Sequence, residues 1–273
     1  AANAEKGFNY TVPNILSKSG TAVRTAIDPR VGDSKWRKLD LPHDWAVELP
    51  FVYKDNFDVM AHGYKPVGGL FPETSIGWYR KHFTISRQDS GSSFQIRFDG
   101  IFRDANIWLN GFYLGNNKSG YVGESYDVTD YINFDRNNVL VVRADASQYE
   151  GWFYEGAGIY RHVWLNKYEN VHIMQDGVFA GSAIVSNKAV VNVETSLQNQ
   201  SAAPSSAVVS VYMTDREGKI VAKSKDQPLT IAVNRQATAI NNISLVNFRN
   251  WTLDDPYLYR VVVEVRVNGK IVD

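Results

Sequence analysis

The 273-residue sequence contains no cysteine, and three kinds of chemistry are therefore absent. Without a thiol the chain forms no disulfide, no zinc thiolate site and no cysteine nucleophile. The lack of cysteine suits a reducing cytosol, and it equally suits an exported protein that needs no disulfide. It therefore leaves the compartment open.

The sequence also lacks net charge and long apolar runs. Its 29 basic residues balance its 29 acidic residues, so no net field attracts a polyanion and nucleic acid is not an expected partner. No run reaches the roughly eighteen apolar residues that cross a bilayer, and the N-terminal AANAEKGFNY lacks the parts of a signal peptide. The sequence predicts a soluble chain with no membrane span.

Several catalytic motifs are missing as well. The five histidines show no HExxH or other metal-ligand spacing, and no GxSxG elbow supports a serine nucleophile. Gly68-Gly69 lacks the lysine and the helix of a phosphate-binding loop. We expect neither a metal nor a cofactor.

What the sequence does contain is strand periodicity. In FQIRFDG the apolar Phe94, Ile96 and Phe98 alternate with polar residues, and the same alternation runs through YRVVVEVRV near the C-terminus. Asn110-Gly111 predicts a two-residue hairpin turn, because both residues tolerate positive φ. No long stripe with a 3.6-residue period is present. These features predict an all-β protein built as sandwiches or barrels.

A change of composition near Lys167 predicts two domains. All but one of the seven tryptophans precede it, whereas serine, valine, alanine and asparagine dominate after it. We place the boundary between Asn166 and Val171. Residues 1–167 are then expected to form an aromatic-rich jelly-roll sandwich that carries a binding surface, and residues 168–273 an immunoglobulin-like sandwich.

Five segments follow one another in order along the whole chain, namely WYRKHF, FDGIFRDANIWLNGFYLG, YDVTDYI, GAGIYRHVWL and DDPYLYRVVVEV. Together they resemble the N-terminal region of glycoside hydrolase family 2, in particular its bacterial β-galactosidases. The resemblance implies a jelly-roll (galactose-binding-like) sugar-binding domain, then an immunoglobulin-like domain, then a TIM barrel that carries two catalytic glutamates.

The resemblance also implies that catalysis lies outside these residues. In the family the acid follows an asparagine, and this sequence contains no Asn-Glu dipeptide. Retaining hydrolysis needs two carboxyl groups about 5–5.5 Å apart on a rigid support. We therefore expect no catalytic residue here, and the expected partners are a β-galactoside or related glycan and the catalytic barrel of a parent protein. A homo-oligomer is also compatible with the sequence.

Aromatic residues within strand patterns are expected in the core, because each large ring gains roughly 4–6 kcal/mol at most from burial. We assign the following rings to packing: Trp78, Tyr79, Phe98, Trp108, Tyr160 and Trp164.

Two loops are candidates for sugar contact, since polar and aromatic loops on rigid sandwiches are common binding sites. In the first, DASQYEGWFYEG, the resemblance places Trp152 where several relatives have an aspartate. One alternative is that Asp145, Glu150 or Glu155 supplies the missing carboxylate. Another is that Trp152 stacks on the sugar. The third is that Trp152 faces the core and does not meet the ligand.

The second loop, GYKPVGGLFPETSIG, reads PETS where the resembling enzymes carry an asparagine, so Glu73 and Thr74 are candidates. The motif PHDW offers His43 and Asp44, for which pinning a loop is the favoured role and ligand contact the alternative.

The leading hypothesis is the non-catalytic N-terminal portion of a family 2 β-galactosidase. A free-standing carbohydrate-binding or adhesive module is an alternative of a different class. The parent could also be a β-glucuronidase or a β-mannosidase, because these share the same N-terminal domains.

Overall fold

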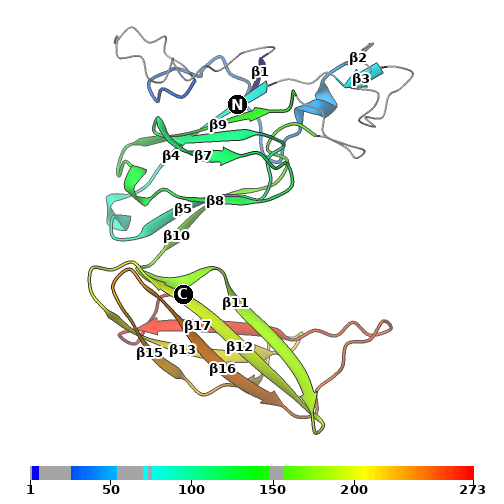
Figure 1. Cartoon of the computed structure of the whole chain (residues 1–273), viewed down its shortest axis with the longest axis vertical. Helices are drawn as coiled ribbons and strands as arrows, with labels where there is room; N and C mark the ends of the chain where they lie inside the picture. The colour runs from blue at the N-terminus through cyan, green and yellow to red at the C-terminus, as the bar shows by residue number, and fades with distance from the viewer. Residues whose placement is uncertain (1, 6–25, 54–69, 73–75, 148–155) are drawn as a thin grey trace. The chain divides into compact units, whose positions relative to one another are not determined.

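The computed structural model describes residues 2–5, 26–53, 70–72, 76–147 and 156–273, with the backbone alone at 2–5, 51–53 and 70–72. The chain divides into two compact units (Figure 1). Unit 1 consists of residues 1–90 and 94–167, and unit 2 of residues 91–93 and 168–273.

Unit 1 is a sandwich of two antiparallel sheets. The five-stranded sheet has the order β1 (Ala2–Glu5), β4 (Ile76–Thr84), β9 (Asn137–Asp145), β6 (Ala105–Leu109), β7 (Phe112–Asn117). The three-stranded sheet has the order β10 (Val163–Tyr168), β5 (Ser93–Phe98), β8 (Glu124–Asp127). A separate pair joins β2 (Phe51–Tyr53) to β3 (Leu70–Pro72), and the 3-10 helices are η2 (Trp45–Glu48), η3 (Arg87–Asp89) and η4 (Thr129–Tyr131). The described residues contain no α-helix, so the prediction of an all-β jelly-roll sandwich is confirmed.

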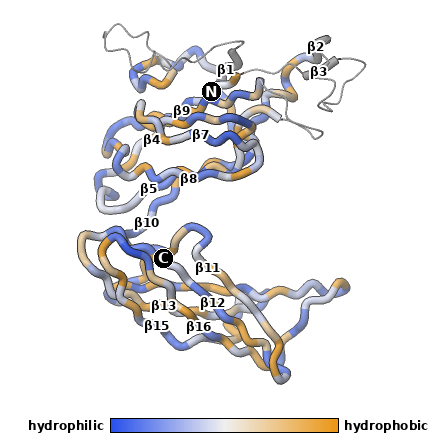
Figure 2. Tube along the Cα trace, in the orientation of Figure 1, coloured by the Kyte–Doolittle hydropathy of each residue, from blue (hydrophilic) through white to orange (hydrophobic). Residues whose placement is uncertain are grey.

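The core of unit 1 lies between the two sheets and follows the predicted alternation. Phe94, Ile96 and Phe98 of β5 are at most 3% exposed, and they meet the fully buried Ile107 and Leu109 of the larger sheet. Figure 2 shows this pattern as hydrophobic and hydrophilic residues succeeding one another along the strands. Burial of one face of each sheet therefore specifies the register of its strands.

Residues 26–36 cover part of the other face of the five-stranded sheet. Trp78 and Trp108 stack there with ring centroids 5.9 Å apart, and both are buried in a cluster that includes Ile27 and Trp36. This small second core makes the two tryptophans packing residues, as predicted.

Arg80 holds the covering segment in place. Its side chain is fully buried, and a buried guanidinium is stable only when its N–H groups are hydrogen-bonded. It donates to carbonyls of the segment and to one carboxylate, namely Ala26 O, Asp28 O, Val31 O and Asp33.

The β6–β7 hairpin turns at Asn110 and Gly111, whose φ angles are 53° and 87°. Positive φ at both positions is the type I′ geometry, which confirms the turn prediction. The register shifts between Ile107 and Trp108, so that Trp108 lies opposite Tyr113 and Asn106 opposite Asn116.

Unit 2 is a second antiparallel sandwich. Its three-stranded sheet has the order β11 (Val171–Val185), β12 (Lys188–Asn199), β16 (Gln236–Leu245). Its five-stranded sheet contains β14 (Ile220–Lys223), β13 (Ser205–Thr214), β17 (Arg260–Val267) and β18 (Lys270–Ile271), with β15 (Gln227–Ile231) also paired to β13. This two-sheet unit is the predicted immunoglobulin-like sandwich.

Most of the rings assigned to packing are buried, and one is not. Trp78, Tyr79, Phe98 and Trp108 are at most 6% exposed, and the half-buried Tyr160 packs against the core. The packing prediction is wrong for Trp164, which is 49% exposed and donates its Nε1–H to Asp99 at 2.8 Å. The reason is its position on β10, an edge strand, where neighbouring strands cover only one side.

Candidate functional site

Two segments distant in sequence meet at one end of unit 1. The amide of His43 donates to Ile159 O at 2.8 Å, and the amide of Trp45 donates to Ala157 O at 2.9 Å. The PHDW motif therefore runs beside the GAGIY motif. We call residues 43–45 together with 157–159 the junction.

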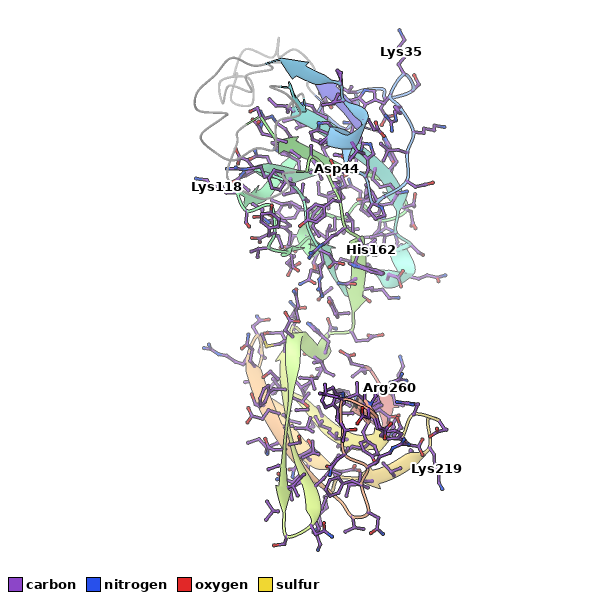
Figure 3. The ribbon with its side chains drawn as sticks, turned by 90° about the vertical axis from the view of Figure 1, so that its right-hand side faces the viewer. Lys35, Asp44, Lys118, His162, Lys219 and Arg260 are labelled. Atoms are coloured by element: carbon purple, nitrogen blue, oxygen red, sulfur yellow. The ribbon has the colours of Figure 1, made fainter. Side chains whose placement is uncertain are left out.

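Asp44 secures the junction through its side chain. Its Oδ1 accepts the amide of Ala46 at 2.9 Å, which caps η2, and the amide of Ala157 at 2.8 Å. Ala157 is 2% exposed, so without Asp44 its N–H would be buried with no acceptor. Figure 3 shows Asp44 among the side chains of unit 1, whereas Lys35 and Lys118 extend from its surface. These contacts favour the pinning role for Asp44.

The two glycines of GAGIY permit this close approach. A Cβ on Gly156 would lie 2.6 Å from Oδ2 of Asp44. A Cβ on Gly158 would lie 2.3 Å from the Tyr79 hydroxyl and 2.8 Å from His43 O. Gly158 also has φ of +120°, a conformation that residues with a side chain rarely adopt. Any larger residue at either position would push the two segments apart.

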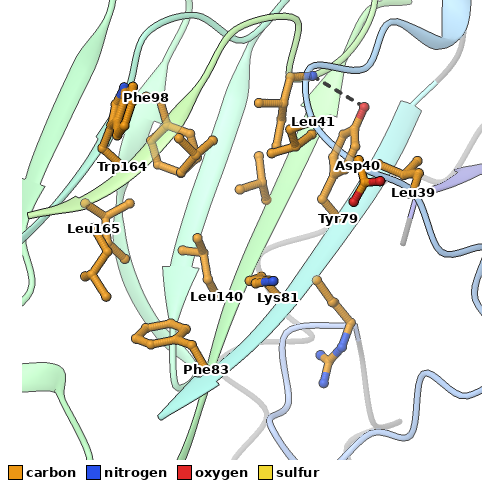
Figure 4. A pocket seen from close by; sticks show the side chains of 15 residues that line it. Leu39, Asp40, Leu41, Tyr79, Lys81, Phe83, Phe98, Leu140, Trp164 and Leu165 are labelled. Atoms are coloured by element: carbon orange, nitrogen blue, oxygen red, sulfur yellow. Dashed lines mark hydrogen bonds between the residues drawn. The ribbon is translucent and has the colours of Figure 1, made fainter. Parts of the chain in front are cut away.

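The imidazole of His43 is bonded at both nitrogens. Its Nδ1 lies 2.8 Å from the Tyr79 hydroxyl, and its Nε2 lies 3.3 Å from Oε1 of Glu48. The Arg37 guanidinium also approaches Nε2, with Nη2 at 3.5 Å. The Tyr79 hydroxyl accepts the amide of Ile159 at 3.4 Å, drawn as the dashed line in Figure 4. His43 is thus part of the junction.

Positive charge beside the junction keeps Glu48 ionised. The hydrogen bonds from Arg37 lower the pKa of Glu48 to about 2, with a further contribution from His43. Burial raises the pKa of Tyr79, so its hydroxyl keeps its proton and can donate to His43.

Asp145 ends β9 and begins the first candidate loop. Its carboxylate accepts from the Arg143 guanidinium at 2.9 Å and from the Ser147 amide at 3.1 Å. Burial by itself would raise the pKa of Asp145, but the bonds from Ser147 and the charge of Arg143 outweigh it and lower the pKa. Asp145 is therefore an ionised acceptor, which is the form that binds sugar hydroxyls.

Asp145 and the junction lie at the same end of the five-stranded sheet. The indole of Trp45 lies against Gly77, whose Cβ, if present, would be 2.4 Å from the ring. Gly77 is the register partner of Ala144, and Ile76 is the partner of Asp145. The structure thus places Asp145 at the same end of the sheet as His43 and Asp44, but on the face opposite to Tyr79, to which His43 is bonded. The remaining candidates, Glu73, Glu150, Trp152 and Glu155, lie outside the described residues.

An apolar cavity of about 440 Å³ lies between the two sheets of unit 1, bounded by strands β4 and β9 and by β5 and β10 (Figure 4). Leucine, isoleucine, valine and phenylalanine dominate its lining, with Asp40 and Lys81 among the few polar residues. A pyranose would bury several hydroxyls there without partners, at a cost of roughly 1–3 kcal/mol each. The cavity is therefore unsuited to a sugar.

Among the described residues, no group of three acids or histidines could hold a metal ion. No helix in the described part of the chain is long and apolar enough to span a membrane.

Two domains of one protein family match the chain. The sugar-binding domain of glycosyl hydrolases family 2 matches residues 26–170, and a second domain of the same family matches residues 171–273. The chain belongs to glycosyl hydrolase family 2.

Relatives in family 2 are much longer than this chain. The β-galactosidase BoGH2A of Bacteroides ovatus is 36% identical over 91% of this chain and 28% of its own length. A β-glucuronidase of Formosa agariphila is 27% identical over 97% of this chain and 28% of its own length. The crystal structure of a family 2 member from Bacteroides cellulosilyticus superimposes with a TM-score of 0.82 and 29% identity, over 92% of this chain and 32% of that one. The chain thus spans about a third or less of these relatives, and its described residues include no TIM barrel.

The structure of this family 2 chain adds partners that the sequence did not single out. Arg143 could have been found, because residues two apart in a strand share a face and Arg143 precedes Asp145 by two. Glu48 and Arg37 lie only five and six residues from His43, but no motif in the sequence indicated that they would meet its ring.

Proposed function

We propose that this chain is the non-catalytic N-terminal portion of a retaining glycoside hydrolase of the β-galactosidase type. It shapes one side of the sugar subsite, while a catalytic barrel elsewhere in the full-length protein supplies the acid and the nucleophile. The matched sugar-binding domain and the β-galactosidase relative of Bacteroides ovatus support this function. In isolation the chain cleaves no glycoside.

The observation that carries the proposal is the support on both sides of residues 148–155. The ionised Asp145 precedes them, and the Asp44 clamp on Ala157 follows them. A site needs rigid support of this kind to position a sugar. Within this frame, Asp145, Glu150, Trp152 and Glu155 are the proposed sugar contacts.

The other candidates receive different roles. Glu73 is a proposed contact from the second loop. His43 and Asp44 are proposed as positioning residues, because the junction occupies both ring nitrogens of His43 and Oδ1 of Asp44.

The test uses the full-length enzyme and a nitrophenyl β-galactoside. Asp145→Asn and Glu150→Gln should lower kcat/KM by about tenfold to a hundredfold each, because they remove positioning contacts worth roughly 1.4–3 kcal/mol. Replacing a barrel glutamate should cost far more, and the exposed Asp254→Asn in unit 2 should cost nothing. Losses as large as that of the barrel glutamate would place catalysis in this chain and refute the proposal.

A β-glucuronidase parent is the second candidate, favoured by the Formosa agariphila relative. Comparing kcat/KM for the nitrophenyl β-galactoside, β-glucuronide and β-mannoside decides between these parents. A glucuronidase would prefer the glucuronide by several orders of magnitude, because its site must pair the sugar carboxylate.

A free-standing carbohydrate-binding module is the third candidate. Titration of the isolated chain with galactose, lactose and glucuronic acid tests it. Tight binding that Asp145→Ala abolishes would support a module complete in itself. Binding that does not depend on Asp145 would belong to another surface.

We also propose that the boundary near Lys167 separates two independently folding domains. The separate cores of the two units support this division. Residues 168–273, expressed alone, should unfold in one cooperative transition with the same midpoint as unit 2 in the whole chain. Failure to fold alone would argue against the boundary.

A further inference from the structure

The outer face of the five-stranded sheet carries a line of polar side chains. In the sheet register Arg143 of β9 lies opposite Asn106 of β6, and Asn106 lies opposite Asn116 of β7. Register partners project to the same face of a sheet. Ala105 and Ile107, the neighbours of Asn106, are fully buried on the inner face, which places all three polar residues on the outer face. We call Arg143, Asp104, Asn106, Tyr113 and Asn116 the polar strip.

Hydrogen bonds within the polar strip hold its side chains in fixed positions. The Tyr113 hydroxyl donates to Oδ1 of Asn106 at 3.2 Å. Nδ2 of Asn116 donates to Oδ1 of Asp104 at 2.8 Å and to Ala105 O at 3.2 Å. Within the described part of the chain this leaves one donor and two acceptors without a protein partner, namely Nδ2 of Asn106, Oδ1 of Asn116 and Oδ2 of Asp104. A donor beside acceptors is the pattern that matches adjacent sugar hydroxyls.

Tyr113 supplies an aromatic surface beside these polar atoms. Its ring centroid lies 5.7 Å from that of the buried Trp108, and 53% of Tyr113 remains exposed. Its inner side covers Trp108 and its hydroxyl is held by Asn106, so the ring loses little side-chain entropy when a ligand stacks on its open side.

The polar strip is continuous with the proposed subsite at Asp145. The Arg143 guanidinium binds the Asp145 carboxylate at 2.9 Å, and the Asp145 amide donates to Arg103 O, next to Asp104. Arg143 itself is buried, so the accessible part of the strip runs from Asn106 to Asn116, with Asp104 and Tyr113 beside them. Asn106 and Asn116 are one strand spacing apart, about 5 Å, which leaves room for one sugar unit beyond the one at Asp145.

We propose that the polar strip is a second sugar subsite, which binds a neutral unit of a β-linked oligosaccharide whose next unit occupies the subsite at Asp145. The class of ligand rests on the proposed function. A neutral unit fits because Asp104 makes no ion pair among the described residues and would repel an anionic sugar. The one guanidinium of the strip, Arg143, is already paired with Asp145.

The test is titration of the 273-residue chain with β-1,4-galactotriose, followed by calorimetry and by amide chemical shifts. The wild type should bind saturably, with shifts at Asn106, Tyr113 and Asn116. Tyr113→Ala should weaken affinity about tenfold or more, since loss of a stacking ring costs about 1.4 kcal/mol. Tyr113→Phe keeps the ring and should weaken affinity by only about twofold to fourfold. An equivalent trisaccharide ending in glucuronic acid should bind more weakly.

The matched control is Phe112→Ala. Phe112 is the preceding residue on β7, is 57% exposed, and packs on Tyr131 away from the strip. It should leave affinity unchanged, and thermal unfolding of each variant confirms that the fold is intact. The proposal is overturned if the wild type does not bind, if Phe112→Ala weakens binding as much as Tyr113→Ala, or if the shifts map elsewhere. Because this titration involves no turnover, it can fail while the hydrolase assays succeed, and the reverse.

Discussion

Replacing Asp44 by alanine removes a side chain that fastens the PHDW motif directly to the GAGIY motif. The carboxylate accepts two amides, from Ala46 in the same turn and from Ala157, which is 113 residues away. Asp44→Ala leaves both donors without this acceptor. The Ala157 amide is buried and water cannot replace the lost bond, whereas water can reach the end of η2 more easily.

The size of the effect follows from these two bonds. An unsatisfied buried N–H costs about 1–3 kcal/mol. Loss of a helix cap costs about 1 kcal/mol, with the low end expected for a four-residue 3-10 helix. We expect unit 1 to lose about 2–4 kcal/mol, which corresponds to a fall in Tm of about 4–16 °C for a domain of its size.

Differential scanning calorimetry on the whole chain measures this loss, with the unfolding of unit 2 as the internal reference. Asp44→Asn keeps an oxygen in the Oδ1 position and should lose clearly less than Asp44→Ala. Asp40→Ala, an exposed acid four residues earlier, should change Tm by less than about 2 °C. If Asp44→Ala unfolds at the temperature of Asp40→Ala, the junction does not depend on Asp44 and our reasoning is refuted.

Three further predictions concern single residues. Gly158→Ala should lower the free energy of unfolding by at least about 2 kcal/mol in urea, because its Cβ meets Tyr79; Gly218→Ala, with φ of +86° but open space around it, should cost less. Folding lowers the pKa of Glu48, so its ion pair with Arg37 stabilises the folded state above pH 4.5, and this stabilisation is lost as the pH falls towards about 2. Glu48→Gln should remove this part of the pH dependence of the free energy of unfolding, which is small because the Arg37–Glu48 pair is partly exposed. The fully buried Asn199 donates to three carbonyls, so Asn199→Ala should destabilise unit 2 by about 2–4 kcal/mol and leave unit 1 unchanged, and equal losses in both units would contradict it.

Local patterns in the sequence were sufficient for the strands and the hairpin. The alternation in FQIRFDG gives the buried face of β5, because side chains of a strand point alternately to its two sides. Asn110-Gly111 gives the turn, because few other residues accept positive φ twice in succession. Both features depend only on residues within a short window.

The candidate site was predicted less completely. Asp145, His43 and Asp44 were named as candidates from the sequence, but most of their hydrogen-bond partners were not. Arg37 and Glu48 are sequence neighbours of His43, yet no periodicity or turn motif indicated that their side chains meet its ring. Trp164 has the strand environment of a core residue and is exposed, because its position at a sheet edge depends on strand order.

The sequence by itself determined that this protein is all-β, that it has no thiol chemistry, and where its chain turns tightly. Only the tertiary structure decided that residues 43–45 pair with residues 157–159 and that Asn106, Tyr113 and Asn116 form one polar surface. The physical reason is the distance along the chain over which each effect acts. Periodicity and turn preference act between neighbours in the chain, whereas register, close approach at glycine and hydrogen bonds to a distant amide exist only after the sheets have assembled.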